Sequence, residues 1–137
     1  MNKELLAQTT KDPEILDGLS QDKDSDVRWC VAENLNTKPE TLDVLSQDEN
    51  SDVRGYVAVN PSTKPETLDV LSRDEDWYVR YGVALNTNTK PETLDVLSLD
   101  EDWRVRRWVA ENPNCSERAY KYIKGLEILE SLSKVST

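Results

Sequence analysis

The residues with the clearest chemical potential are carboxylates that alternate along one short segment. Asp22, Asp24 and Asp26 occupy every second position, and Glu33 follows 11 residues after Asp22. Oxygen ligands at alternate positions of a tight loop, closed by a glutamate, are the pattern by which proteins bind Ca²⁺. Val27, however, stands where such a loop requires glycine. These acids suit a loop and a helix N-cap better, and we expect no calcium site and no other metal site.

The chain offers little else for catalysis or for cofactor binding. It contains no histidine, which removes Ser-His and Cys-His nucleophile pairs and every histidine metal site. It has only 4 glycines and none of the glycine-rich loops that cradle phosphate. Paired carboxylates are abundant, but they recur at a regular interval, which is typical of surface and capping groups. We therefore expect a protein that is not an enzyme and that uses no cofactor.

Charge is distributed unevenly along the chain. Residues 1–102 contain 10 Lys and Arg against 23 Asp and Glu, whereas residues 103–137 contain 7 against 4. The net charge of the whole sequence is −10. An acidic body repels phosphate backbones, so general nucleic-acid binding is disfavoured. Solubility is the simplest explanation of the acidic surface.

The remaining composition indicates a cytoplasmic protein. Cys30 and Cys115 lie 85 residues apart, which matches neither the paired spacing of a metal site nor a disulfide scaffold. The first residues, MNKELLAQTT, contain no apolar segment of the kind found in signal peptides. No run approaches the roughly 20 apolar residues that a membrane span requires.

The elements that must position any functional residue are set by an internal repeat. Four prolines, Pro13, Pro39, Pro65 and Pro91, follow one another at an unbroken period of 26 residues. The phrase TKPETLDVLS occurs three times unchanged. A fixed period of about 20 to 50 residues indicates a stacked array of identical structural units. We place an N-terminal cap at residues 1–10, full repeats at 11–36, 37–62, 63–88 and 89–114, and a C-terminal capping helix within 115–137.

Each repeat is predicted to form two short helices. The first would begin at a Thr followed three residues later by Glu, a capping-box pattern with Pro in the first turn. These threonines are Thr37, Thr63 and Thr89. Only about two turns fit before the next loop, so this helix would be a short α-helix or partly 3₁₀. The second helix would follow an Asp or Asn that can serve as its N-cap, namely Asp24, Asn50, Asp76 and Asp102.

Positions that are identical in every repeat should serve stacking. At 100° per residue, one face of the second helix combines Val27, Cys30, Val31 and Asn34. The Asn column, which is Asn34, Asn60, Asn86 and Asn112, would adopt a left-handed conformation or tie down loop backbone. We expect the Arg column (Arg28, Arg54, Arg80, Arg106) to pair with the Asp column (Asp22, Asp48, Asp74, Asp100).

Positions that differ between repeats are where function could reside. The outward columns of the second helix are Trp29, Gly55, Tyr81 and Arg107, and, one turn later, Glu33, Val59, Leu85 and Glu111. Exposed aromatic side chains and Arg are the residues that contribute most energy to interfaces. We predict a partner-binding surface formed by Trp29, Glu33, Val59, Tyr81, Leu85, Arg107 and Glu111, with Trp77, Trp103 and Arg104 as secondary candidates. Tyr56 and Trp108 lie in the column of Cys30 and Gly82, so we expect them to pack against the core.

The repeat resembles a known family. The pattern V-R-x-x-V-A-x-N-x-x-T-x-P-E-x-L-x-x-L-S-x-D, found here from Val53 to Asp74, resembles the leucine-rich repeat variant, and the likeness covers residues 11–114. The acidic residue ahead of Val-Arg is also similar to short HEAT repeats. This resemblance implies an all-α solenoid of two-helix repeats, α and 3₁₀, wound into a right-handed superhelix without strands. It implies no single activity.

Together these features predict a non-enzymatic scaffold module, a monomer or weak homo-oligomer, that binds a protein or peptide of basic and apolar character. One alternative is a structural unit that assembles with copies of itself. Another is a HEAT-like nucleic-acid binder that uses the basic C-terminal third. Its contacts would be Trp103, Arg104, Arg106, Arg107 and Trp108.

Overall fold

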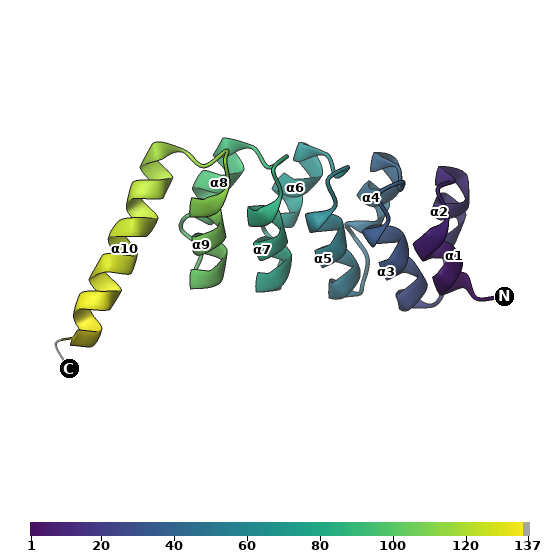
Figure 1. The fold of residues 1–137 in the computed structure, drawn as a ribbon, viewed down its shortest axis with the longest axis horizontal. Coiled ribbons are helices and arrows are strands. Elements are labelled where there is room, and N and C mark those ends of the chain that lie inside the picture. Colours follow the sequence, from purple (N-terminus) through teal and green to yellow (C-terminus); the bar gives the residue numbers. More distant parts are fainter. Residues whose placement is uncertain (136–137) are drawn as a thin grey trace.

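The chain is entirely helical in the computed structural model, which describes residues 1–135. These residues form ten α-helices and no strand, as the repeat predicts. The helices are α1 (Lys3–Thr9), α2 (Pro13–Leu19), α3 (Ser25–Glu33), α4 (Pro39–Leu45), α5 (Ser51–Val59), α6 (Pro65–Leu71), α7 (Trp77–Leu85), α8 (Pro91–Leu97), α9 (Trp103–Glu111) and α10 (Glu117–Val135). Figure 1 shows them as a single row, with the N-terminus at one end and the C-terminus at the other.

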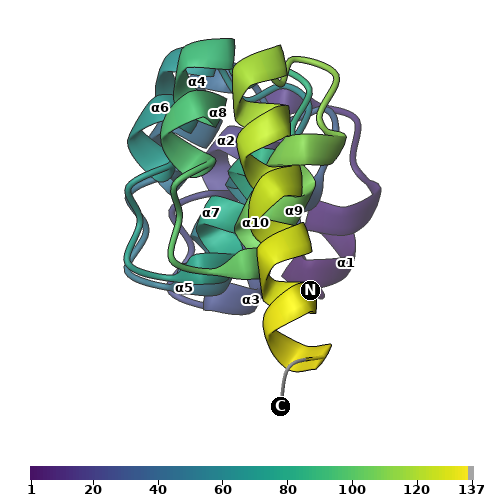
Figure 2. The same cartoon turned by 90° about the vertical axis from the view of Figure 1, so that its left-hand side faces the viewer.

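The helices form two layers. The first helices of the repeats (α2, α4, α6 and α8) lie in the upper layer of Figure 1, and the second helices (α3, α5, α7 and α9) lie in the lower layer. Each second helix packs against the second helix of the next repeat, whereas neighbouring first helices have few contacts with one another. Seen along the row, successive repeats overlay one another (Figure 2). The fold is therefore an α-solenoid in which each repeat contacts only its neighbours.

The hydrophobic core runs without a break through all repeats. Each first helix contributes two leucines three residues apart, such as Leu68 and Leu71, which are buried. Each second helix contributes a valine from its first turn and a Val-Ala pair from its last, such as Val79, Val83 and Ala84. The face predicted from the helical spacing is the face that the structure buries.

The second helices begin as their sequences predict, with one exception. The side chains of Asp24, Asn50 and Asp102 accept hydrogen bonds from backbone N–H groups in the first turns of α3, α5 and α9. Asp76 makes no such bond, because its carboxylate pairs at 3.1 Å with Arg54 of the preceding repeat. The first helices are α-helical along all seven of their residues.

The capping box predicted for the first helices is wrong. The helix α4 begins at Pro39 with Lys38 as its N-cap, and no side chain caps it. The hydroxyl of Thr37 is buried and instead donates to the carbonyl of Val31 at 2.6 Å. Carbonyls in the last turn of a helix lack the usual donor four residues later, and within residues 1–135 that of Val31 otherwise accepts only from the N–H of Asn34, at 3.2 Å. Since that acceptor is buried beside Thr37, the threonine closes the end of the preceding helix rather than the start of its own.

The Arg and Asp columns form an ion-pair ladder between repeats. The first three arginines each pair with the aspartate 20 residues later, at 2.7 Å for Arg28 with Asp48 and for Arg80 with Asp100, whereas the last, Arg106, pairs with Glu130 of α10. The same guanidinium of Arg28 donates to the carbonyl of Asp22 at 2.8 Å, so it also holds the loop of its own repeat. The paired side chains of Arg28 and Asp48 are only 11% and 7% exposed. Removing one partner would leave a largely buried charge without compensation.

The Asn column forms a second ladder at the C-terminal ends of the second helices. The side-chain amide of Asn60 donates to the carbonyls of Ala32 at 2.8 Å and of Asn34 at 3.2 Å in the preceding repeat. The side-chain oxygen of Asn60 accepts from the N–H of Ser62 in its own loop. No residue among 1–135 has a positive φ angle. Of the two roles considered for this column, tying down backbone is therefore the one that the structure uses.

The two ends of the stack are closed by different helices. The helix α1 packs against α3 as each second helix packs against the next, so it occupies the place of a second helix at the N-terminal end. The helix α10 packs against α9 and extends beyond it (Figure 1). Among the apolar residues of α10, Ala119 and Ile123 are buried, whereas Tyr122 and Leu129 are exposed. Leu129 belongs to the outer half of the helix, which no neighbouring helix covers.

Within residues 1–135, no helix combines the length and the apolar character that are needed to cross a membrane.

Candidate partner-binding surface

The residues predicted to bind a partner lie on the second helices, on the side away from the buried valines. We call this set the outer strip. It consists of Trp29, Glu33, Val59, Tyr81, Leu85, Arg107 and Glu111. Trp29, Tyr81 and Leu85 are half-buried, and the other four residues are exposed. The two rings are thus neither free in solvent nor enclosed in the core.

Aromatic rings of the strip are joined in pairs across the repeat interfaces. Trp29 of α3 meets Tyr56 of α5 edge to face, with ring centres 5.0 Å apart. Tyr81 of α7 meets Trp108 of α9 in the same manner at 6.1 Å. We expected Tyr56 and Trp108 to pack against the core. Tyr56 does so while remaining partly exposed, as do Trp29 and Tyr81, whereas Trp108 is 37% exposed and belongs to the surface.

The interface between these two pairs contains glycine in place of rings. A Cβ atom on Gly82 would lie 2.8 Å from the Cβ of Ala58 and 3.4 Å from the carbonyl oxygen of Gly55. Helices α5 and α7 therefore approach closely at a point where the neighbouring interfaces hold aromatic pairs. The sequence does contain a signal for this arrangement. Across successive interfaces the pairs are Trp29 with Tyr56, Gly55 with Gly82, and Tyr81 with Trp108, so ring meets ring and glycine meets glycine.

A second set of contacts joins the helix entrances. Position 25 of one repeat meets position 26 of the next, in the numbering of the first repeat. The hydroxyl of Tyr78 and that of Ser51 are hydrogen-bonded across the α5–α7 interface. Across the α7–α9 interface, the guanidinium carbon of Arg104 lies 3.5 Å above the centre of the Trp77 ring. The equivalent residues at the α3–α5 interface are Ser25 and Asp52.

Arg104 is held in place by more than the Trp77 ring. Its guanidinium forms two hydrogen bonds with the carboxylate of Asp102, at 2.8 and 3.0 Å. This hydrogen bonding lowers the pKa of Asp102 and raises that of Arg104. Trp77 also meets Tyr81 with ring centres 5.8 Å apart, so it is covered by the protein's own residues. Of the secondary candidates, Trp103 is the one whose ring is largely exposed.

The α3–α5 interface is hollow where the α7–α9 interface is covered. A cavity of about 320 Å³ opens there, lined by Ser25, Asp26, Trp29, Asn50, Asp52 and Tyr56. A neighbouring cavity of about 250 Å³ is lined by Asp52, Gly55, Tyr56, Val59 and Tyr78. Within residues 1–135, neither Asp26 nor Asp52 has an ion-pair partner. The first cavity thus combines an aromatic pair with two uncompensated carboxylates.

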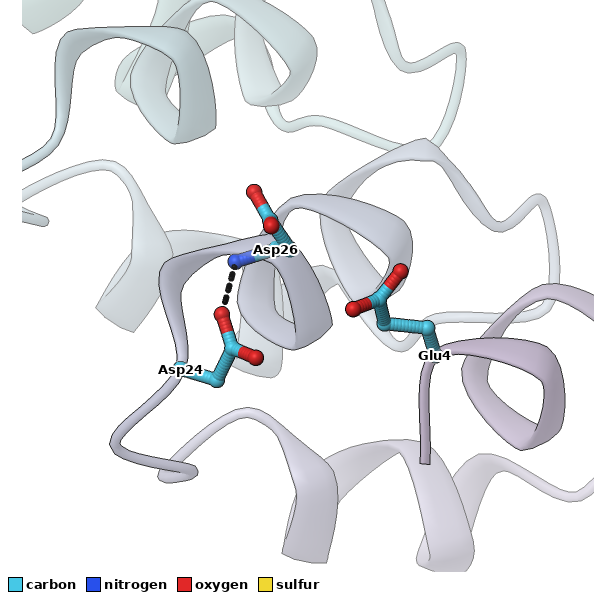
Figure 3. A group of neighbouring side chains, drawn as sticks. All are labelled: Glu4, Asp24 and Asp26. Carbon is cyan, nitrogen blue, oxygen red and sulfur yellow. Dashed lines mark hydrogen bonds between the residues drawn. The ribbon is translucent and has the colours of Figure 1, made fainter. Parts of the chain in front are cut away.

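The acids with calcium-like spacing serve the loop and the start of α3. The carboxylate of Asp24 accepts from the N–H of Asp26 at 2.9 Å, and that of Asp22 pairs with Lys3 at 2.8 Å. The hydrogen bond from Lys3 is the main reason that the pKa of Asp22 is lowered. Glu4 of α1 joins Asp24 and Asp26 in an exposed cluster whose oxygens lie within 4.8 Å of one another (Figure 3). These carboxylates add to the negative charge of the N-terminal half of this face.

The basic C-terminal third offers fewer available charges than its sequence indicates. Arg106 donates to the carbonyl of Asp100 at 2.7 Å and pairs with Glu130 at 3.4 Å. Arg104 is engaged by Asp102 and Trp77. Of the three arginines in α9, Arg107 is the one that makes no ion pair or ring contact within residues 1–135.

Comparison with known proteins finds no family model and no curated protein that matches the chain. The resemblance to the leucine-rich repeat variant therefore stays a prediction from the repeat pattern.

Proposed function

We propose that the protein is a non-enzymatic scaffold module that binds a protein or peptide along the outer strip. The observation that supports this most is that the identical and the variable positions of the repeat lie in different parts of the structure. Columns that are identical in the repeats are used in the core, the Arg–Asp ladder and the Asn ladder. Columns that vary gather on the outer face of the second helices, where half-exposed rings lie beside unpaired charges. Variation concentrated on an exposed face is what a binding surface requires and what stacking does not.

The chemistry of the face favours a partner with apolar and basic side chains. Trp29, Tyr56 and Val59 offer apolar contact area, and rings of this kind are frequent anchors in interfaces. Glu33, Asp26 and Asp52 give the same region a negative potential, which attracts basic partners. Two of the three α9 arginines are engaged within the protein, which supports a peptide or protein partner over nucleic acid. Both cysteines are free thiols, consistent with our proposal of a reducing, cytoplasmic setting.

Self-assembly is the second candidate, and a specific feature favours it. The outer half of α10 carries Ile128, Leu132 and Val135 at helical spacing, and all three are exposed. An uncovered apolar face of this kind can pair with a second copy. Sedimentation analysis over a hundredfold range of concentration tests it. A Leu132→Ser variant should shift the profile towards monomer if this face associates.

Selection from a displayed random-peptide library tests the main proposal. Binding of the selected peptides would be measured by calorimetry for the wild type and for the double variant Trp29→Ala/Tyr81→Ala. We expect a loss of about 1–3 kcal/mol in binding free energy for each ring removed. The matched control is Val44→Ala/Val70→Ala, which removes exposed apolar side chains from the first helices. Thermal melts would confirm that each variant remains folded.

Two outcomes would contradict the proposal. One is a set of selected peptides that bind the ring variant as tightly as the wild type. The other is an equal loss in the valine control, which would show that the peptides respond to general surface hydrophobicity.

A further inference from the structure

The molecule contains its own example of how a cation occupies this surface. At the α7–α9 interface, Arg104 lies 3.5 Å over the Trp77 ring with its guanidinium bonded to Asp102. A ring face attracts a cation through its quadrupole, and a carboxylate beside the ring fixes the orientation of a planar guanidinium. Ring, carboxylate and guanidinium together form one complete unit on the protein surface.

The α3–α5 interface holds rings and carboxylates too, but at other positions, because Ser25 and Asn50 stand at the positions equivalent to Trp77 and Asp102. Trp29 and Tyr56 provide the rings, and Asp26 and Asp52 provide carboxylates around a cavity of about 320 Å³. The residue equivalent to Arg104 in this part of the stack is Asp52, so the charge at this position is reversed. Where the C-terminal interface carries its own guanidinium, the N-terminal interface carries negative charge and open volume.

We propose that the cavity between α3 and α5 binds an arginine side chain of the peptide partner. This proposal rests on the proposed function and names the chemistry that the outer strip selects. The guanidinium stacks on Trp29 or Tyr56 and donates its N–H groups to the carboxylates of Asp26 and Asp52.

Arginine fits this cavity better than lysine does. The guanidinium is planar, stacks on aromatic faces and can donate to two carboxylates at once, whereas the ammonium of lysine is compact and strongly hydrated. Asp26 and Asp52 belong to successive repeats, and both line the cavity. A forked donor that contacts both carboxylates therefore spans the interface in a way that a single ammonium does not.

Titration of N-acetyl-arginine methylamide into ¹⁵N-labelled protein provides the direct test. The observed signals are the indole N–H resonances of the four tryptophans. We expect a saturable shift of Trp29, and we expect the uncharged citrulline analogue to bind at least about fivefold more weakly. Trp77 should shift little, because Arg104 already covers it. Equal binding of the two compounds at Trp29, or no saturable shift there, would overturn the proposal.

Substitutions test which groups hold the side chain. Asp26→Asn/Asp52→Asn should weaken arginine binding at least about fivefold, whereas Glu75→Gln/Glu92→Gln should leave it unchanged. The control pair removes the same charge from exposed residues without an ion pair in residues 1–135. Asp52→Arg should abolish binding by placing a guanidinium at the position equivalent to Arg104. Retained binding in Asp52→Arg, or equal losses in the two charge-matched pairs, would contradict the assignment.

The selected peptides separate this proposal from the proposed function. Peptides that lose affinity when Trp29 is truncated, and that also lose it when one arginine becomes citrulline, support both. Peptides that depend on Trp29 and on no arginine leave the proposed function intact and overturn the arginine site. Saturable arginine binding at Trp29 without any peptide that uses the strip overturns the proposed function alone.

Discussion

The α3–α5 and α7–α9 interfaces are built from the same repeat and carry opposite surfaces. Both hold an edge-to-face ring pair, and both lie on the same continuous core. The first surrounds its rings with unpaired carboxylates, while the second covers Trp77 with Arg104. Because the core and the two ladders are repeated unchanged, the outer columns are free to differ. A repeat architecture thus separates the residues that stabilise the stack from those that define its surface.

The largest expected effect tests whether the two interfaces unfold together as parts of one cooperative stack. Leu71 lies in α6 between them and is 2% exposed, so Leu71→Ala should cost about 2–5 kcal/mol in unfolding free energy. Denaturant melts followed by fluorescence would measure this cost, and both ends of the stack should unfold at the same lower midpoint. The control is Val70→Ala, whose side chain is 59% exposed. A cost below about 0.5 kcal/mol for Leu71→Ala would mean that the leucine does not support the stack.

The next test alters the glycine interface that separates the two ring pairs. Gly82→Ala should destabilise by about 1–3 kcal/mol, because its Cβ would lie 2.8 Å from the Cβ of Ala58. Gly55→Ala places its Cβ 3.5 Å from the Tyr78 ring, which is an ordinary contact. That variant should be neutral or stabilising by up to about 1 kcal/mol, since Ala favours helix over Gly. In thermal melts, Gly82→Ala should therefore lower the melting temperature, whereas Gly55→Ala should leave it unchanged or raise it.

A third test converts the covered interface into an open one. Arg104→Ala removes the guanidinium from Trp77 and leaves the carboxylate of Asp102 in place. In the arginine titration we expect the Trp77 indole to gain a saturable shift that the wild type lacks. Arg107→Ala serves as the control, because it removes the same charge from α9 without uncovering Trp77. An unchanged Trp77 response in Arg104→Ala would show that Arg104 is not what prevents this ring from binding a guanidinium.

The smallest expected effect is on one pKa. Hydrogen bonding with Arg104 holds the pKa of Asp102 below its ordinary value. The stabilisation from this pair is present above the ordinary pKa of aspartate, about 3.9, and is lost as the pH falls through the lower folded-state pKa. Carbon-detected NMR titration should show the Asp102 pKa returning towards the ordinary value in Arg104→Ala. Equal values in wild type and variant would indicate that Arg104 does not pair with Asp102 in solution.

Most of the stack was predictable from the sequence, because the same pattern of structural residues recurs in all four repeats. The helix faces and three of the four second-helix N-caps follow from spacing within one repeat, and the Arg–Asp pairs between repeats follow from two columns that recur in every repeat. The role of Thr37 was not predictable, since its acceptor, the carbonyl of Val31, belongs to the preceding helix. The local capping-box pattern is present but is outcompeted by this buried acceptor.

The surface was harder to predict because its contacts depend on the offset between neighbouring repeats. On a helical wheel, positions 29 and 30 point in different directions. Trp29 nevertheless contacts Tyr56, which occupies the position of residue 30 in the next repeat. The contact of Arg104 with Trp77 follows a similar offset between adjacent columns. The alternation of ring pairs with a glycine pair is the one pattern in the sequence that could have indicated the first of these offsets.

The Asn ladder has a consequence for how an array of this type can change in length. Each rung joins one repeat only to the repeat before it, as Asn86 does with the carbonyls of Ala58 and Asn60. A duplicated copy of residues 63–88 would therefore supply its own donors and find its own acceptors. At the new interface, Tyr81 of the first copy would lie beside Gly82 of the second copy, so that a ring would face a residue without a side chain. Gene duplication could thus set the distance between the two ring pairs in steps of one repeat. The Asn hydrogen bonds at each new interface would form without further substitutions.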